Sequence, residues 1–323
     1  MQACPVAAIR LENLGERRHR AKTPEAKKQV ELSWTDQDDQ LVKKMAGKDE
    51  AKPFPRRFMD DESLGPVYWL GHHNEKSFGA TPYLIQTSYK GQDNVWIMVD
   101  TPKYGPSALK AVESLTGSGG PDYLFLTHVD DTNSHDQWAE HYQRQSGKNG
   151  MKRIFHAGDL GRHNWLGDLT LEDVEILLKK EEANTSENLT AYNLAGEILP
   201  SDWEESCDDE VVILHTPGHS PGSITLYKRP RNEHAGILFT GDTYGWTTRN
   251  GGKMNGFPMY GNNLLVQAET LEKMLGYEWD VIAPGHGHPR NYLDVSQDKN
   301  QRQQARQADL QVALDDMTVS RRW

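Results

Sequence analysis

Residues 211–223 read Val-Val-Ile-Leu-His-Thr-Pro-Gly-His-Ser-Pro-Gly-Ser. The run begins with four aliphatic residues, as is typical of a short buried strand. A turn rich in Pro and Gly follows at once and carries His219. Because Gly and Pro permit sharp turns, such a segment can aim a side chain back over the end of the strand. The stretch therefore predicts a strand that ends at a functional histidine.

Three further patches share this design, in which an apolar run ends and His or Asp follows directly. They are Leu-Thr-His128-Val-Asp130-Asp131-Thr-Asn-Ser134-His135, Phe-Thr-Gly-Asp242-Thr and Ala-Pro-Gly-His286-Gly-His288. Each patch taken singly is more typical of an ordinary turn, since short motifs often match by chance. Their occurrence together indicates one site at the rim of a sheet, where rigid strands fix the ligands.

Imidazole and carboxylate groups in one site suit a divalent metal ion such as zinc, manganese or iron. A bound ion lowers the pKa of its water from about 15.7 toward about 7, which gives a hydroxide at neutral pH. Two ions about 3.5–4 Å apart can share that hydroxide and stabilise a leaving oxygen. The four patches therefore predict one or two divalent metal ions, with a small molecule as the substrate.

Short apolar runs and helical patterns alternate along the chain and predict a layered α/β domain. We expect strands at Val67–Leu70, Tyr83–Thr87, Asn94–Val99, Tyr123–Thr127, Arg153–Phe155, Val211–Leu214, Ser223–Tyr227, Ile237–Thr240 and Val281–Ala283. We expect helices at Pro106–Leu115, His135–Gln145, Leu264–Leu275 and Gln297–Met317. Because Pro53 and Pro55 mark a boundary, the predicted units are a polar N-terminal extension (1–60), the α/β domain (61–295) and a helical tail (296–323).

The order of these motifs resembles the metallo-β-lactamase superfamily, from about Val67 to Tyr292. Leu-Thr-His128 is similar to the start of the family's His-x-His-x-Asp-His loop. The segments around His219, Asp242 and His286 are similar to its later motifs. The resemblance implies an αββα sandwich with an N-terminal extension and a C-terminal helix, and a site at one edge. It is specific for the fold and says little about the substrate.

The first loop departs from the family pattern, and two alignments are open. An ungapped match puts Asp130 in place of the second histidine, and Thr132 and Asn133 in place of the Asp-His pair. If the loop has two extra residues, His135 takes the place of the last histidine and Ser134 replaces the aspartate. We prefer the second alignment, because it keeps two histidines and the helix that follows.

On this alignment the resemblance assigns six metal ligands. One metal is expected to use His128, Asp130 and His219, and the other His135 and His286, with Asp242 bridging the two. Asp131 is then the candidate catalytic carboxylate that compensates for the serine. The carboxylate at position 130 favours iron or manganese relative to zinc. Occupancy by one metal and by two both stay open, because the number of ligands decides it.

The resulting prediction is a metal-dependent hydrolase that uses metal-bound hydroxide on an ester, thioester, lactone or phosphoester. A non-haem iron redox protein of the same fold is the alternative, because a carboxylate in the first loop is similar to diiron members of the superfamily. A degenerate domain that only binds partners is the third hypothesis, motivated by Ser134. The shape of the pocket depends on residues 157–209 and 244–262, so the substrate is open.

Composition limits the compartment and the partners. The chain has 36 Lys and Arg against 47 Asp and Glu, a formal net charge of −11, which argues against a broad nucleic-acid surface. Cys4 and Cys207 lie too far apart in sequence to indicate a disulfide framework, and no apolar run reaches the length of a membrane helix. We therefore expect a soluble intracellular protein without membrane contact, its oligomeric state open.

The N-terminus carries one further resemblance. Ala3-Cys4-Pro5 is similar to the closing Cys-Pro segment of a bacterial-type ferredoxin motif, although the three preceding cysteines of that motif are absent. Two interpretations are equally open. The segment is a ferredoxin-like remnant, which implies a ferredoxin-type redox link, or it is a Cys-Pro pair that occurs by chance.

Overall fold

The computed structural model describes residues 23–25, 28, 54–146, 150–179, 188–231, 234–247 and 252–320. The Cys4 segment and most of the predicted extension lie outside these residues. Within the described ranges, no helix is both long and apolar enough to cross a membrane.

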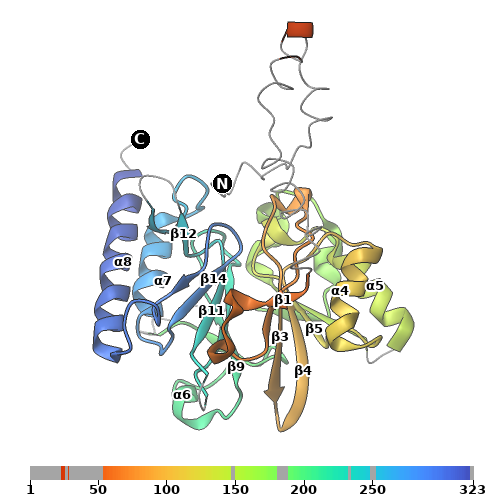
Figure 1. Cartoon of the computed structure of the whole chain (residues 1–323), viewed down its shortest axis with the longest axis horizontal. Helices are drawn as coiled ribbons and strands as arrows, with labels where there is room; N and C mark the ends of the chain where they lie inside the picture. Colours follow the sequence, from red (N-terminus) through yellow and green to blue (C-terminus); the bar gives the residue numbers. More distant parts are fainter. Residues whose placement is uncertain are drawn as a thin grey trace.

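Two sheets face each other and form the centre of the molecule (Figure 1). The first contains, in spatial order, β1 (Arg56–Arg57), β2 (Val67–Trp69), β3 (Tyr83–Tyr89), β4 (Gln92–Val99), β5 (Tyr123–Phe125), β6 (Lys152–His156) and β7 (Ile176–Leu178). The second contains β15 (Arg290–Asn291), β14 (Val281–Pro284), β11 (Ile237–Gly241), β10 (Ile224–Lys228), β9 (Val211–His215) and β8 (Ala191–Tyr192). A hairpin of β12 (Gly245–Thr247) and β13 (Lys253–Asn255) forms a separate two-stranded sheet.

Helices cover the outer face of each sheet, so the predicted αββα sandwich is confirmed (Figure 1). Those beside the first sheet are α4 (Pro106–Thr116) and α5 (His135–Ser146). Those beside the second are α6 (Trp203–Ser206), α7 (Leu264–Met274) and α8 (Lys299–Ser320). The 3₁₀ turns are η1 (Phe58–Asp60), η2 (Glu62–Leu64), η3 (Glu75–Ser77), η4 (Val129–Asp131), η6 (Ala157–Asp159), η7 (Gly161–His163) and η8 (Leu169–Asp173).

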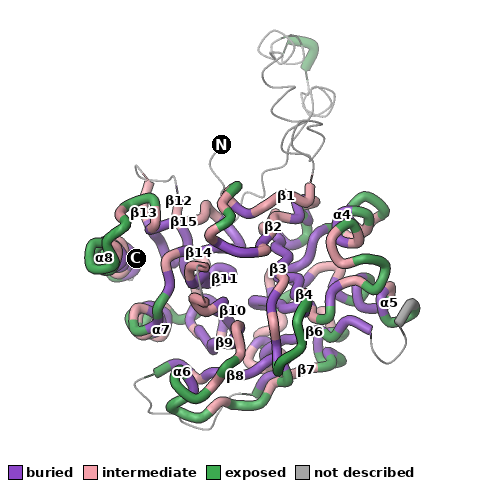
Figure 2. Tube along the Cα trace, turned by 60° about the horizontal axis from the view of Figure 1, so that its bottom comes forward, coloured by how far each residue is buried: buried purple, intermediate pink, exposed green. Residues whose placement is uncertain are grey.

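Alternating side chains of the strands build three apolar layers. In Figure 2, strands such as β11 and β14 are coloured as buried. On β5, Phe125 points into the cluster between the two sheets, whereas Leu124 packs beneath α4 and α5. On β11, Phe239 belongs to the cluster between the sheets and Leu238 to the layer beneath α7 and α8. Because successive residues of a strand point to opposite faces, strands buried on both sides are apolar at every position. This is why the sequence shows continuous apolar runs.

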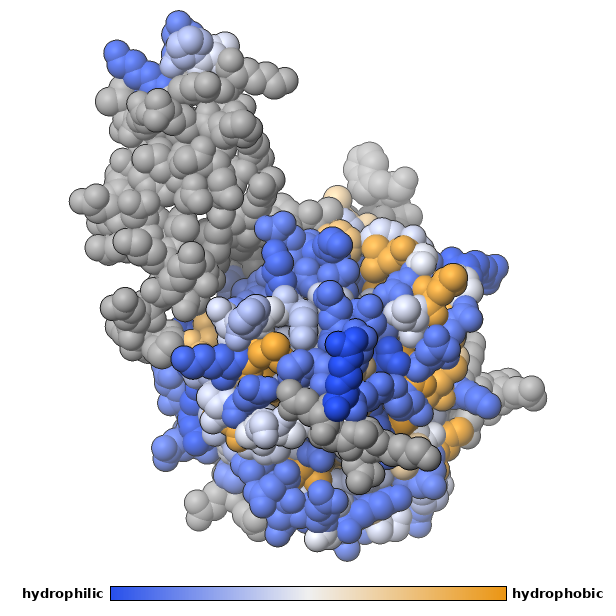
Figure 3. All heavy atoms as spheres, turned by 90° about the vertical axis from the view of Figure 1, so that its right-hand side faces the viewer, coloured by the Kyte–Doolittle hydropathy of each residue, from blue (hydrophilic) through white to orange (hydrophobic). Residues whose placement is uncertain are grey.

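The C-terminal helix begins two residues later and ends three residues later than predicted, and it packs on the second sheet. Its residues Leu310, Ala313 and Met317 are buried in the layer that covers the second sheet. Arg302 on the same helix forms an ion pair with Asp280 at 2.7 Å, just before β14. The remaining surface is polar, as the mean hydropathy of −0.77 requires, and Figure 3 shows a mainly hydrophilic face on the side of α4 and α5.

The direction of the strands explains where a site can form. Strands β4, β5 and β6 run parallel. In the second sheet β11 and β14 are parallel, and β9 runs the same way because both β9 and β11 are antiparallel to β10. The carboxyl ends of each set therefore lie at one edge of their sheet. Tyr83 joins the sheets near this edge, because its hydroxyl donates to the carbonyl of Pro284 at 2.8 Å.

Candidate metal centre

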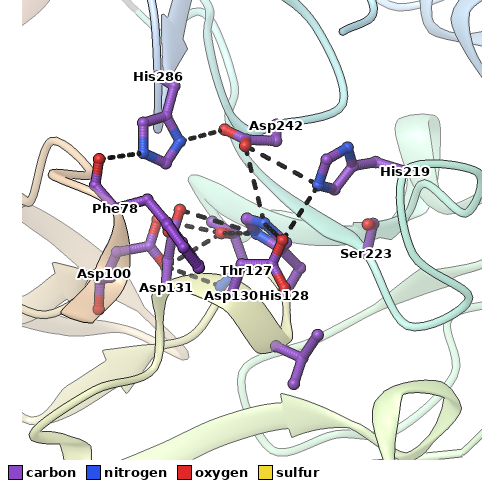
Figure 4. Close-up of polar contacts among 12 residues, drawn as sticks. Phe78, Asp100, Thr127, His128, Asp130, Asp131, His219, Ser223, Asp242 and His286 are labelled. Carbon is purple, nitrogen blue, oxygen red and sulfur yellow. Dashed lines mark hydrogen bonds and ion pairs between the residues drawn. The ribbon is translucent and has the colours of Figure 1, made fainter. Parts of the chain in front are cut away.

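Four side chains from three strand ends form a first group of donors (Figure 4). The Nε2 atoms of His128 and His219 lie 3.7 and 3.6 Å from Oδ2 of Asp130. The same two atoms lie 3.9 and 3.8 Å from Oδ2 of Asp242. Ligands bound at about 2.0–2.1 Å to a tetrahedral ion lie roughly 3.3–3.4 Å apart. The donor atoms of this group are therefore slightly farther apart than those around a bound tetrahedral ion. Histidine and carboxylate are nevertheless residue types that bind such ions.

A second group shares Asp242 with the first. Asp131, Asp242 and His286 each offer one ligand atom, and these atoms lie within 4.8 Å of one another. Oδ1 of Asp242 is 2.8 Å from Nδ1 of His286, whereas its Oδ2 faces the two histidines of the first group. One carboxylate thus turns one oxygen toward each group, which is the arrangement expected of a bridging ligand.

Buried donor atoms without partners test whether these residues suit a metal. Within the described residues, Nε2 of His128 and both carboxylate oxygens of Asp131 are buried and have no hydrogen-bond partner. Buried polar atoms are rarely left unpaired, so such atoms point to a missing partner. The glycine at position 285 leaves space beside Asp131 for such a partner, because a Cβ atom there would lie 2.9 Å from Oδ2 of Asp131. The residues therefore fit a divalent cation.

The surroundings of His128 set which ring nitrogen faces the centre. Thr127 Oγ1 lies 3.0 Å from both oxygens of Asp100 and 3.0 Å from Nδ1 of His128. When the buried Asp100 is ionised it can only accept, so the threonine hydroxyl donates to it and accepts from Nδ1–H. The lone pair of His128 then lies on Nε2, toward Asp130 and Asp242. Such outer contacts are the usual means of orienting a metal-binding histidine.

Burial and mutual charge shift the pKa values of three of the donors. Burial lowers the pKa of His128 to about 4, which keeps its imidazole neutral and able to bind a metal. Burial raises the pKa of Asp131 well above its usual range, despite the nearby His286. Although burial opposes it, the carboxylates of Asp242 and Asp131 raise the pKa of His286 to about 10. The second group thus sets two buried carboxyl groups, Asp131 and Asp242, against the single imidazole of His286, and a divalent ion would supply further positive charge.

A tight turn delivers Asp242 to the centre. Gly241 ends β11 with φ of +50°, and a Cβ atom there would lie 2.5 Å from Thr127 Oγ1. Only glycine combines this left-handed conformation with such a close approach. The Gly-Asp242 pair is therefore explained by the contact between the two sheets at the threonine that orients His128.

The structure brings five of the predicted site residues together with Asp131 and leaves His135 out. His135 is buried at the start of α5, with Nε2 3.2 Å from Oδ2 of Asp168 and Nδ1 3.2 Å from Nη1 of Arg153. Both of its ring nitrogens are therefore engaged by protein groups away from the centre. Asp131 occupies the place in the second group that the sequence assigned to His135. The ungapped alignment fits the loop at Asp130, but it does not predict Asp131, because it puts Thr132 and Asn133 in place of the Asp-His pair.

Asp159 is a site residue that the motifs did not reveal. It follows β6 at the same sheet edge, and its Oδ2 accepts hydrogen bonds from the backbone N–H of Val129 at 3.0 Å and from the hydroxyl of Ser220 at 2.7 Å. Its Oδ1 accepts from the N–H of Gly222 at 2.6 Å. This carboxylate ties the loop of His128 to the loop of His219. The sequence could have indicated Asp159 only through its position shortly after a predicted strand that ends at this edge.

We expect Asp159→Ala to weaken metal binding about 10–100-fold, because losing a group that orients ligands typically has this effect. The measurement is zinc affinity by competition with a chromogenic chelator. Asp202→Ala, which removes an exposed carboxylate, is the control and should bind as wild type does. Wild-type affinity in the Asp159 variant would contradict a positioning role.

Comparison with known proteins finds similarity at the level of fold. No protein-family model and no curated protein sequence matches the chain. Among solved structures, the DIM-1 metallo-β-lactamase is 14% identical at a TM-score of 0.47, covering 80% of this chain and 98% of its own. The class B3 di-zinc metallo-β-lactamase LRA-12 from an Alaskan soil metagenome is 15% identical at a TM-score of 0.45, covering 83% and 93%. A superfamily protein from the archaeon Sulfolobus tokodaii is 16% identical at a TM-score of 0.40, covering 76% and 97%. These proteins bear the name of the superfamily that the sequence motifs resemble, and such low identities say nothing about the substrate.

Proposed function

We propose that this protein is a metal-dependent hydrolase that cleaves an uncharged carboxylic ester, thioester or lactone. The observation that carries the proposal is Asp242, whose two oxygens face two separate groups of buried donors. His128, His219 and Asp130 would hold one ion with it, and Asp131 and His286 the other. A divalent ion bound there supplies Lewis acidity and lowers the pKa of water.

The protein residues orient these donors and limit the water around them. Thr127 and Asp100 fix the tautomer of His128, and Asp159 holds the two histidine loops together. The donor atoms of both groups belong to side chains that are buried or nearly so. Low exposure strengthens electrostatic interactions with a polarised carbonyl group. The resulting chemistry is attack on an acyl carbon.

The charge around the centre favours an uncharged substrate over a phosphoester. Within the described chain, Asp130, Asp131 and Asp242 form ion pairs only with histidines, and no lysine or arginine pairs with them. Sites that bind transferring phosphoryl groups commonly add arginine or lysine to the metal. This centre offers carboxylates instead, so an ester or lactone carbonyl suits it better.

Elemental analysis of the protein purified without chelators tests the proposal. We expect close to two metal equivalents per chain in the wild type, and about one in Asp131→Ala, which loses a ligand of the second group only. His219→Ala should also lose about one equivalent, from the first group. Val312→Ala, on the exposed face of α8, is the control for handling.

The same preparations are then screened against carboxylic esters, lactones and phosphoesters. Turnover of an ester or lactone that disappears on chelation supports the proposal, and full turnover by metal-stripped protein would overturn it. A metal content that is mostly iron, together with redox-active spectra, would favour the redox alternative. The carboxylate oxygens among the donors are compatible with iron. A chain that takes up no metal after reconstitution would leave the fold with a binding role only.

A further inference from the structure

An exposed aromatic side chain lies directly beside the first donor group. The indole Nε1–H of Trp165 donates to Oδ1 of Asp130 at 2.7 Å, and the other oxygen of that carboxylate faces His128 and His219. The ring of Trp165 is nevertheless 59% exposed. A large apolar side chain that is held at a metal centre and left open to solvent is a candidate contact for a substrate.

A second aromatic ring links Trp165 to the other donor group. Phe78 stacks on Trp165 with ring centroids 5.9 Å apart and an interplanar angle of 29°. The carbonyl of the same residue is 3.2 Å from Nε2 of His286. The stacked pair therefore reaches from a residue of the first group to a residue of the second. We call these two rings the aromatic wall.

The conformation of Phe78 is unusual for a bulky residue. Its φ of +49° and ψ of +17° lie in the left-handed region that glycine prefers. Such conformations cost free energy and are concentrated at functional sites, where the surrounding structure holds them. Here the conformation places the carbonyl against His286 and the ring against Trp165 at the same time.

The segment that carries Trp165 is fastened to the buried part of the domain. Oδ2 of Asp168 lies 3.2 Å from Nε2 of His135, which is fully buried. The side chain of Asn164 donates to the carbonyl of Asp168 at 2.7 Å and accepts from its N–H at 3.2 Å. Trp165 is thus held from both sides of its own position in the chain. A ring fixed in this way loses little entropy when a ligand stacks on it.

The segment also exposes more apolar surface than isolated surface residues normally do. Leu166 is 38% exposed and Leu169 is 72% exposed, four residues or fewer from Trp165. Several exposed apolar side chains in one short segment mark a binding surface, whereas single ones do not. Because Trp165 is hydrogen-bonded to Asp130, a ligand bound on this surface lies beside the candidate metal centre.

We propose that the aromatic wall of Phe78 and Trp165 is the specificity subsite of this enzyme, and that it selects esters or lactones bearing an aromatic ring beside the scissile carbonyl. This inference rests on the proposed function, since the carbonyl is the group that the metal centre would bind. The ring of the substrate stacks on the exposed face of Trp165. Aromatic pairs gain stability beyond that of buried area alone, so an aryl group binds better there than a saturated ring of equal size.

The test compares two metal-directed probes, phenylacetohydroxamic acid and cyclohexylacetohydroxamic acid, whose metal-binding groups are identical. Binding to the metal-loaded protein is measured by calorimetry, together with the metal content of each sample. We expect the wild type to prefer the aryl probe roughly tenfold. Trp165→Leu and Phe78→Leu should reduce this preference to about twofold or less, because only the aryl probe loses an aromatic partner.

Two further variants make the result specific. Trp165→Phe keeps an aromatic face but loses the hydrogen bond to Asp130, so it should keep most of the aryl preference while its metal affinity falls. Val312→Ala, on the exposed face of α8, should behave as wild type does. Unchanged preference in Trp165→Leu, or equal binding of both probes by the wild type, would overturn the aromatic wall.

The outcomes separate this inference from the proposed function. If the fully metal-loaded protein hydrolyses esters but binds both probes equally, only the aromatic-wall proposal is overturned. If the protein prefers the aryl probe but turns over no ester or lactone, the aromatic wall stands as a ligand site and the proposed hydrolase function is overturned. A chain that takes up no metal overturns both.

Discussion

Replacing Asp242 with alanine is expected to remove both metal ions and to lower ester turnover by at least about 10³-fold, the equivalent of roughly 4 kcal/mol of activation free energy. The reason is geometric. Oδ2 of Asp242 faces His128 and His219, and Oδ1 faces His286, so one substitution takes a donor from each group. No other side chain in the described structure belongs to both groups.

The measurement is elemental analysis together with kcat and KM on the best ester found. Asp93→Ala, which removes an exposed aspartate of β4, is the matched control and should keep full metal content. Circular dichroism shows whether the Asp242 variant is folded. Asp131→Ala gives the result independent support, because it should lose about one equivalent where Asp242→Ala loses two. A folded Asp242→Ala that keeps both metals would disprove the bridging role.

The sequence predicts much of this centre because turn chemistry is local. His219, Asp242 and His286 each follow an apolar run and a glycine, and the structure places all three at one sheet edge. Parallel strands explain this result, since their carboxyl ends meet. The order of the motifs was therefore enough to assemble these three residues, even though they are far apart in the chain.

The ligands of the first loop could not be predicted in the same way, because residues 128–135 contain several possible donors close together. The spacing does not show that η4 turns Asp130 and Asp131 toward the centre. Nor does it show that Ser134 takes a φ of +78° just before α5 begins, after which His135 is buried against Arg153 and Asp168. Only tertiary contacts decide which donors of such a loop face inward.

Several of the shortest strands were also not predicted from the sequence. Strands β1, β8, β12, β13 and β15 are too short to show a period of two, and β7 contains only three apolar residues. Phe78 and Trp165 were not predicted as site residues either. Their importance depends on a contact between two loops that are far apart in the sequence. Patterns within one segment cannot reveal such a contact.

Glu210→Ala is expected to lower the free energy of unfolding by about 3–5 kcal/mol, because it leaves a buried charge without its partner. Lys228 on β10 is fully buried, and its Nζ lies 3.0 Å from Oε1 of Glu210. Oε2 of the same glutamate accepts from Thr87 Oγ1 at 2.9 Å and from the N–H of Ser88 at 3.1 Å. Since these last two residues lie on β3, the carboxylate joins the two sheets at a point distant from the metal centre.

Urea unfolding of the metal-free proteins at pH 7 measures the effect. Glu278→Ala is the control: it breaks an exposed ion pair with Lys299, and such pairs contribute about 0–1 kcal/mol. The double variant Glu210→Gln with Lys228→Met should recover most of the loss, because it removes both charges together. A Glu210→Ala protein as stable as the control would show that the buried lysine finds another partner.

The pH dependence gives the same pair a second signature. Although burial opposes it, the ammonium of Lys228 lowers the pKa of Glu210 below its ordinary value of 4.5. A carboxyl group whose pKa is lower in the folded chain stabilises the fold fully above its unfolded pKa, and this contribution is lost as the pH falls through the folded value. The difference in stability between wild type and the double variant should therefore be constant from pH 7 to about 5 and should change in acid below about 4.5. A difference that stays constant down to about pH 3 would mean that Glu210 does not carry this charge.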